Sequence, residues 1–321
     1  MIDKIIMKKN LLSFILVCSC ILAHAESSNV IKMVIAFPPG GPVDSTARSL
    51  LEPLAKELGV QIIVDNKPGG NGAIAFEALS SSPADGKTIW FTSAGAVAIN
   101  PGLYEKLAYN PQKDLAPVSL VANNVEVLVV APSSPANNAV EFVALAKKSD
   151  LSMGSSGTGS VPHLALEQLN DAANIKIVHI PYKGAAPAIT DVMAGHVDGF
   201  FGDIPGLMGY IKSGKLKAIG LAADQRNSAI PDVKTFHELG LKGVDTNNWY
   251  AVFVKSGTPK AQIDRLSEAI KKVVSQDPLK SKLLQSGSEP IGSSPEELAV
   301  VLKKDTAKWT QLIKAKKITA E

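Results

Sequence analysis

The chain has 321 residues, with 33 basic against 30 acidic side chains and a formal net charge of +3. That small excess leaves no polybasic footprint, which excludes nucleic acid as an expected partner. Only three arginines occur, at positions 48, 226 and 265, so arginine forks are a scarce means of holding a carboxylate. Backbone N–H groups and hydroxyls are the better candidates for that task.

Residues 1–25 predict a cleavable secretory signal. Three lysines precede a twelve-residue apolar run over 11–22, and Ala23-His24-Ala25 forms a small-residue cleavage site. The run is too short to span a bilayer, which needs roughly 20 apolar residues, and both Met1 and Met7 fit as its start. Both cysteines of the chain lie in this segment. The mature chain is therefore expected to be exported and free of disulfides.

The most informative stretch covers residues 31–48. A β-branched apolar strand over 31–37 runs into Pro38-Pro39-Gly40-Gly41, and Asp44 or Ser45 is expected to cap the helix that follows. A glycine loop before a helix offers free N–H groups and a positive dipole end, which suits an anion. The loop contains neither of the nucleotide-binding patterns G-x-x-x-x-G-K-[ST] and G-x-G-x-x-G. A carboxylate is therefore expected rather than a nucleotide phosphate. On this loop alone, an ordinary strand-to-helix turn remains an equal alternative.

Strand and helix patterns alternate through the rest of the chain. A helix over 47–58 carries Pro53, which is expected to kink it. Further strands are predicted at 61–64, 88–92, 125–131, 151–154, 176–180, 197–201, 216–221 and 250–254. Further helices are predicted at 72–79, 139–147, 161–172, 185–194, 205–212, 261–275, 278–285 and 295–314. This order predicts parallel sheets with right-handed crossovers.

The mature chain of about 296 residues exceeds one typical core, so two domains are expected. The predicted fold class is α/β, with two parallel-sheet βα domains joined by two crossing segments near 122–124 and 246–248. Domain 1 would take residues 26–122 and 248–321, and domain 2 would take residues 123–247. A cleft between them would receive the ligand, because ligands of open α/β sheets sit at the carboxyl ends of the strands.

A second glycine-rich loop, residues 154–160, precedes a helix and repeats the pattern of the first. Two such loops, one from each domain, could hold the two ends of an anionic ligand. Thr92, Ser93 and Ala94 end another predicted strand and could add hydroxyl and amide contacts. Asp203 ends a strand of the second domain. It would either pair with a ligand amine or cap the following helix.

His163 lies three residues after Ser160, a spacing that suggests a nucleophile and its base. The chain lacks a G-x-S-x-G elbow, and no orienting acid or oxyanion hole can be identified, so no enzyme is expected. The other histidines have neither metal-ligand spacing nor cysteine partners. We therefore expect neither a metal nor a cofactor.

Several motifs occur together nearly end to end: FPPGGPVD from Phe37, VDNKPGGNG from Val64, SSGTG from Ser155 and HIPYKG from His179. In these residues the chain resembles the extracytoplasmic solute receptors of the tripartite tricarboxylate transporter group, also called Bug receptors. The resemblance implies a periplasmic binding protein of type II (Venus flytrap). Such receptors bind small carboxylates, amino-dicarboxylates or related organic acids and work with integral-membrane transporter subunits.

The stretch Gly199-Phe-Phe-Gly-Asp-Ile-Pro-Gly206 looks closest to the aspartate-binding branch. Its acid, Asp203, stands one position later than in many members, which leaves open which side chain contacts the ligand.

We thus predict a monomeric periplasmic receptor for a small organic acid or amino acid. Two alternatives stay open: a ligand-presenting partner of a membrane sensor kinase, and an exported hydrolase using Ser160 or Ser156 with His163. The predicted ligand-binding residues are Phe37, Pro39, Gly40, Gly41, Asp44, Thr92, Ser93, Ala94, Ser155, Ser156, Gly157, Thr158, Ser160, His163 and Asp203.

Overall fold

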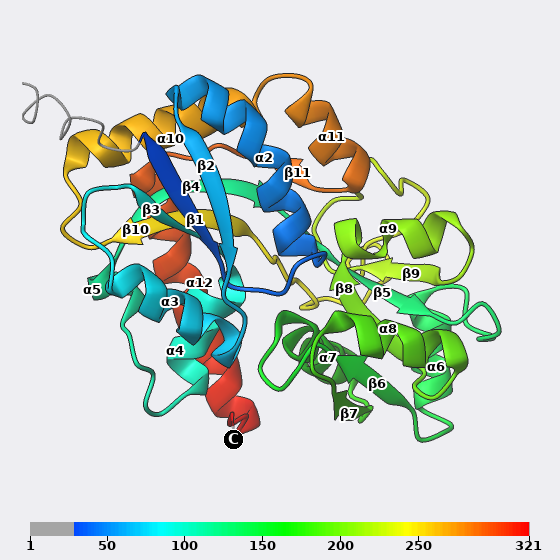
Figure 1. Ribbon diagram of the computed structural model, residues 1–321. Coiled ribbons are helices and arrows are strands. Elements are labelled where there is room, and N and C mark those ends of the chain that lie inside the picture. Colours follow the sequence, from blue (N-terminus) through cyan, green and yellow to red (C-terminus); the bar gives the residue numbers. More distant parts are fainter. Residues whose placement is uncertain (1–28, 321) are drawn as a thin grey trace, which may run out of the picture.

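The computed structural model describes residues 29–320, which form two β-sheets with helices on both faces of each (Figure 1). The predicted secretory signal lies outside the described residues. The chain builds strands β1 to β4 of the first sheet, crosses to build all of the second, and returns to complete the first. This arrangement confirms the predicted two-domain α/β fold class.

The first sheet has six strands in the order β11-β4-β10-β3-β1-β2. They are β1 (Val30–Ile35), β2 (Gln61–Asn66), β3 (Thr88–Ser93), β4 (Leu115–Asn123), β10 (Tyr250–Lys255) and β11 (Glu289–Pro290). One face packs against α2 (Pro42–Leu58), α10 (Lys260–Val274) and α11 (Leu279–Ser286). The other face packs against α3 (Ala73–Ser80), η2 (Gly95–Ile99), α4 (Asn100–Leu103) and α12 (Pro295–Lys316). Short segments η1 (Gly70–Gly72) and α5 (Pro111–Asp114) lie in the connections.

The second sheet has five strands in the order β7-β6-β8-β5-β9. They are β5 (Glu126–Val130), β6 (Ser152–Ser155), β7 (Val178–Pro181), β8 (Gly199–Asp203) and β9 (Lys217–Leu221). One apolar core forms between this sheet and α6 (Ala139–Ala146) and α7 (Val161–Ala173). A second core forms on the opposite face beneath α8 (Ala185–Ala194) and α9 (Ile204–Lys212).

Both sheets are mixed, although βα order predicted parallel ones. Strand β1 is parallel to β2 and β3, and β6 is parallel to β7 and β8, as predicted. Strand β5 runs antiparallel to β8 and β9, and β10 runs antiparallel to β3 and β4. These two strands begin directly after the chain has crossed between the sheets. No helix of the same domain returns the chain to the start of the sheet before them, which a parallel strand would need. Strand β4 was not predicted at all.

The two crossing segments lie side by side. Val125 forms an antiparallel bridge with Asn247, and the N–H of Asn248 donates to the carbonyl of Asn124 at 2.8 Å. The Nδ2 of buried Asn124 donates in turn to the carbonyl of Asn248 at 3.1 Å. Main-chain and side-chain bonds therefore join the two crossings, while the domain boundaries at 122/123 and 247/248 stay predictions.

Helix α2 follows the first glycine loop, and residues suited to helix ends stand at both of its termini. Pro42 occupies its first turn after Gly41, the N-cap residue, which corrects the expectation that Asp44 or Ser45 would cap it. Proline fits there because its missing N–H would have no intrahelical partner. The helix ends at Gly59, whose left-handed backbone suits glycine. Its buried face consists of Val43, Ala47, Leu50, Leu54 and Leu58.

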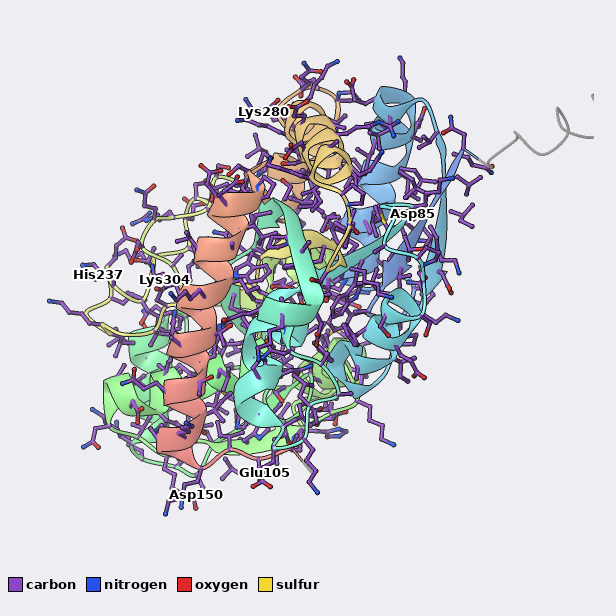
Figure 2. The ribbon with its side chains drawn as sticks, turned by 90° about the vertical axis from the view of Figure 1, so that its left-hand side faces the viewer. Asp85, Glu105, Asp150, His237, Lys280 and Lys304 are labelled. Atoms are coloured by element: carbon purple, nitrogen blue, oxygen red, sulfur yellow. The ribbon has the colours of Figure 1, made fainter. Side chains whose placement is uncertain are left out.

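Charged side chains of both signs lie around the outside of the molecule. Figure 2 shows Asp85, Glu105 and Lys304 projecting outward from three different parts of the first domain, and all three are exposed. Such mixed charge agrees with the absence of a basic footprint in the sequence. Within residues 29–320, no helix is both long enough and apolar enough to cross a bilayer.

The start of α12 offers a test of the fold. Ser294 accepts from the N–H of Glu297 at 3.1 Å, and the Glu297 carboxylate accepts from the N–H of Ser294 at 2.8 Å, forming a capping box. Ser294→Ala should lower the free energy of unfolding in urea by about 1 kcal/mol. The control Thr306→Ala removes a hydroxyl bonded to the carbonyl of Leu302 in the same helix and should cost less than about 0.5 kcal/mol. Equal losses would contradict the capping role.

Candidate functional site

Strand-to-helix connections of both domains contact the opposite domain where the two sheets adjoin. In the first domain they follow β1 and β3, and in the second they follow β6 and β8. Pro42, at the start of α2, lies so close to α9 that a Cβ on Gly206 would fall 2.6 Å from its Cγ. Figure 1 shows this approach of α2 to α9. Leu103 of α4 likewise fills the space beside Gly159 in the second glycine loop.

The first glycine loop is held by a buried carboxylate. Oδ2 of Asp44 accepts from the N–H of Gly40 at 2.9 Å and from Nε of Arg48 at 2.8 Å. Its Oδ1 accepts from Nδ2 of Asn66 at 2.9 Å, and the same amide also donates to the carbonyl of Phe37. Burial opposes ionisation of Asp44, but these hydrogen bonds outweigh it and lower the pKa of its carboxyl. Because both oxygens are engaged, Asp44 positions the loop, while its predicted ligand contact stays a prediction.

The other predicted ligand-binding residues of this loop are at least partly accessible to solvent. Pro39 and Gly40 are exposed, Phe37 and Gly41 are partly buried, and Gly40 has a φ of +81°. An L-residue is strained at such an angle, so glycine is required by the backbone even though nothing lies within 4 Å of a Cβ built there. The first N–H groups of α2 lack intrahelical partners and point out of the helix start.

The end of β3 brings hydroxyls to the same boundary. Thr92, Ser93 and Ala94 are buried, and the N–H of Ala94 donates to the carbonyl of Trp249 at 3.0 Å. Oγ1 of Thr92 is fully buried and has no hydrogen-bond partner among residues 29–320. The following segment, η2, is a π-helix, a form that recurs at functional sites.

The second glycine loop folds around Ser155 and His163. Oγ of Ser155 lies 2.6 Å from Nε2 of His179 and accepts from the N–H of Gly157 at 3.1 Å. The N–H of Gly159 donates to Nδ1 of His163 at 3.0 Å. Ser160 is the N-cap residue of α7, and its Oγ donates to the carbonyl of Gly157 at 2.7 Å. Ser156 is partly buried, and Thr158 is exposed.

This geometry does not support the serine hydrolase alternative. Nδ1 of His163 already accepts from Gly159, and its Nε2 lies 3.9 Å from the Glu167 carboxylate. No bond between His163 and either Ser156 or Ser160 occurs in the described chain. His163 instead stacks on His179 with ring centroids 3.6 Å apart. Burial lowers the pKa of His163 to about 3, further lowered by His179, and lowers the pKa of His179 to about 4. Both rings are therefore neutral at physiological pH.

Asp203 lies at the end of β8 and is bonded to the other sheet. Its Oδ2 accepts from the hydroxyl of Tyr250 at 2.5 Å and from Nδ2 of Asn248 at 3.0 Å. Although Asp203 is the N-cap residue of α9, its side chain makes no capping bond, so that expectation was wrong. The predicted contact between Asp203 and a ligand amine stays a prediction.

Four residues of this region were missed by the sequence analysis: Glu126, His179, Asn248 and Tyr250. Glu126 carried a usable signal, because an acid inside the apolar strand over 125–131 is rarely buried without a partner. The other three become recognisable only when strands far apart in sequence adjoin.

Each of the three arginines has a hydrogen-bond partner within the described chain. Arg48 pairs with Asp44, Arg226 pairs with Glu238 at 2.9 Å, and Nη2 of Arg265 donates to the carbonyl of Leu58 at 2.8 Å. Within residues 29–320, no group of three or more His, Cys, Asp or Glu side chains could hold a metal ion.

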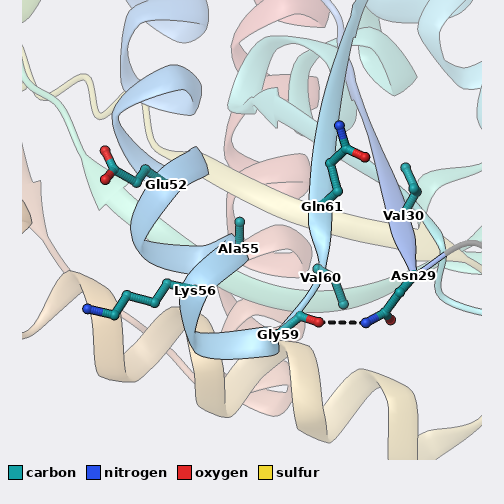
Figure 3. Close-up of a pocket in the computed structure, with 8 residues that line it drawn as sticks. All are labelled: Asn29, Val30, Glu52, Ala55, Lys56, Gly59, Val60 and Gln61. Carbon is teal, nitrogen blue, oxygen red and sulfur yellow. Dashed lines mark hydrogen bonds between the residues drawn. The ribbon is translucent and has the colours of Figure 1, made fainter.

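Some surface hollows lie away from this boundary. One of about 640 Å³ lies between the end of α2 and the starts of β1 and β2 (Figure 3), at the opposite end of α2 from its glycine loop. It is lined by Asn29, Val30, Glu52, Ala55, Lys56, Gly59, Val60 and Gln61. Because this hollow lacks buried polar groups and helix starts, we do not assign it to the ligand.

Comparison with known proteins agrees with the arrangement of loops and sheets. The profile described as tripartite tricarboxylate transporter family receptor matches residues 46–318. The chain belongs to this receptor family. A relative from Pseudomonas sp. (strain P51), the "UPF0065 protein in tcbD-tcbE intergenic region", is 34% identical over 292 residues. The match covers 90% of this chain and 87% of the relative.

Solved structures of receptors have the same fold. The periplasmic binding protein BugD is 30% identical with a TM-score of 0.83, and the match covers 91% of this chain and 99% of that one. MatC from Rhodopseudomonas palustris with bound malate is 28% identical with a TM-score of 0.80, covering 88% and 98%. The predicted family is confirmed, whereas the aspartate-binding branch stays a prediction.

The bonds of Asp44 offer a test of how the site is positioned. Asp44→Asn keeps the side chain's size but replaces one acceptor oxygen with a donor and removes the charge that faces Arg48. We expect about 2 kcal/mol lower free energy of unfolding in urea, since hydrogen bonds to charged groups contribute about 1.5–3 kcal/mol. The matched control is Asp65→Asn, which breaks only surface ion pairs with Lys32 and Lys67 and should cost less than about 1 kcal/mol. A variant Asp44→Asn as stable as the control would contradict the positioning role.

Proposed function

We propose that this chain is a periplasmic receptor that binds a small carboxylate between its two domains and delivers it to a tripartite tricarboxylate-type membrane transporter. The observation that carries the proposal is that two glycine loops, each at a helix start, lie against the opposite domain, with Pro42 beside Gly206 and Gly159 beside Leu103. One loop precedes α2, and the other precedes α7. The fold of a receptor that holds malate supports a carboxylate as the ligand class.

The ligand is held by main-chain N–H groups rather than by arginine. The three arginines are engaged elsewhere, whereas helix starts supply unpaired N–H groups and the positive end of the helix dipole. The unpartnered hydroxyl of Thr92 adds a donor between them. The ligand favours closure because it contacts both domains, and the hinge motion takes place at the two crossing segments.

Export, partners and the lack of catalysis belong to the same proposal. The signal over residues 1–25 sends the chain to the periplasm, where it acts as a receptor rather than an enzyme. Neutral His163 and His179, bonded within their own loop, support a role in shaping the loop rather than in proton transfer. The closed receptor then presents the ligand to integral-membrane transporter subunits.

The two loop glycines give a direct test. Gly40→Val and Gly157→Val place a β-branched residue at φ values of +81° and +132°, which L-residues avoid. Each should distort its loop and weaken binding at least about tenfold, or about 1.4 kcal/mol. The matched controls are Gly59→Val and Gly195→Val, which impose similar backbone strain at the ends of α2 and α8. Unchanged affinity in both loop variants would overturn the two-loop proposal.

The ligand class is tested by thermal unfolding of the mature chain with aspartate, glutamate, succinate, malate, adipate, citrate and nicotinate. A ligand at a hundred times its Kd adds about 2.7 kcal/mol, which gives a visible shift in Tm. Stabilisation by aspartate but not succinate would place Asp203 at the ligand amine. Stabilisation only by unaminated acids would leave Asp203 without a ligand role. No shift with any acid, together with ester turnover, would reject the receptor proposal.

A further inference from the structure

A cluster of buried oxygen atoms at the crossing between the sheets lacks hydrogen-bond partners in the described chain. They are both carboxylate oxygens of Glu126, Oδ1 of Asp203, Oγ1 of Thr246 and Oδ1 of Asn248. All four residues lie where the crossing segments adjoin β5 and β8. A buried acceptor without a donor costs about 1–3 kcal/mol. A proton on one of these carboxyl groups would give the cluster a donor for a neighbouring oxygen atom.

Glu126 and Asp203 are direct neighbours in this cluster. They oppose each other in the antiparallel pair of β5 and β8, which places their side chains on the same face of the sheet. The Glu126 side chain is fully buried. Asp203 also reaches the first sheet, because its Oδ2 accepts from Tyr250 of β10. The carboxyl group that accepts the bond from the first sheet therefore has a second carboxyl group, that of Glu126, directly beside it.

No positive charge compensates the pair. None of the ion pairs formed within residues 29–320 includes Glu126 or Asp203. The titratable groups that face Asp203 are Glu126 from β5 and Tyr250 from β10, and the crossing segment adds the neutral amide of Asn248. Two adjacent buried carboxylates cannot both stay ionised without a cation. One of them must carry a proton.

We propose that Glu126 and Asp203 form a one-proton site in which Glu126 carries the proton and donates it to Oδ1 of Asp203. Asp203 then remains ionised and accepts from Tyr250 and Asn248, so the proton on Glu126 maintains the bond between the sheets. Loss of this proton puts two negative charges at the crossing and loosens the contact of Asp203 with Tyr250. The one-proton site is proposed for the ligand-free chain, and Asp203 is also the predicted partner of a ligand amine.

The electrostatic surroundings fit this assignment of the proton. Burial raises the pKa of Glu126 well above its usual range, and the charge of Asp203 raises it further. Burial also raises the pKa of Asp203, to about 6, against the opposing bonds from Tyr250, Glu126 and Asn248. Because the pKa of Glu126 is higher in the folded than in the unfolded chain, the folded state holds the extra proton. Its contribution to stability therefore falls as the pH rises above the usual glutamate range.

The experiment measures urea unfolding of the ligand-free mature chain between pH 7 and pH 9, above the pKa of Asp203, for the wild type and for Glu126→Gln. One extra proton in the folded state raises the unfolding equilibrium constant about tenfold per pH unit. Glutamine stays neutral and still donates, so this contribution should disappear in Glu126→Gln. The control Glu52→Gln, an exposed residue of α2, should keep the slope of the wild type. A slope in Glu126→Gln equal to that of the wild type would overturn the proposal.

A second variant covers the case in which Glu126→Gln does not fold. Asp203→Asn removes only the neighbouring charge, so the slope should fall less than in Glu126→Gln, because burial alone still raises the pKa of Glu126. The infrared spectrum of the wild type at pH 7 should show the carbonyl band of a protonated carboxylic acid, and Glu126→Gln should lack this band. The absence of that band from the wild type would refute the one-proton site. Neither readout uses a ligand, so failure here is distinguishable from failure of the receptor proposal.

Discussion

The scarcity of arginine limits how this receptor can hold an anion through side-chain forks. Each arginine is bonded to another part of the described chain, to Asp44, Glu238 or the carbonyl of Leu58. Main-chain N–H groups at helix starts are then the available donors, and they face outward only when glycine loops give them room. The buried carboxylate of Asp44 ties Gly40, Arg48 and Asn66 into one rigid arrangement behind the first loop.

The second constraint is the contact between the two sheets. Polar bonds join them at the crossings through Asn124, Asp203 and Asn248, and ion pairs join them farther out. Lys316, near the end of α12, pairs with Glu167 at 3.4 Å and also with Asp171 of α7. Asp171 is exposed, and Lys316 and Glu167 are only partly buried, so these ion pairs lie nearer to solvent than the hydrogen bonds at the crossing segments. Exposed pairs contribute little individually and break easily.

The sequence predicted local structure well because its signals are local. The apolar strand before Pro38, the glycine loops and the helical periodicity of α2 and α7 all lie within short windows, and most predicted helices and strands are present. Strand β4 and the antiparallel direction of β5 and β10 depend on where the chain crosses between sheets, which no local window contains. For the same reason the contacts of Asp203 with Tyr250 and of Ser155 with His179 could not be predicted. The family resemblance supplied the ligand class.

The most direct test is a crystal structure of the mature chain with the acid that raises its Tm most. The account predicts a carboxylate at the boundary between the sheets, with its oxygens about 2.7–3.2 Å from main-chain nitrogens at the starts of α2 and α7. It also predicts that Arg48 remains bonded to Asp44 in the complex. An acid bound to an arginine, or bound in the hollow at the far end of α2, would contradict this prediction.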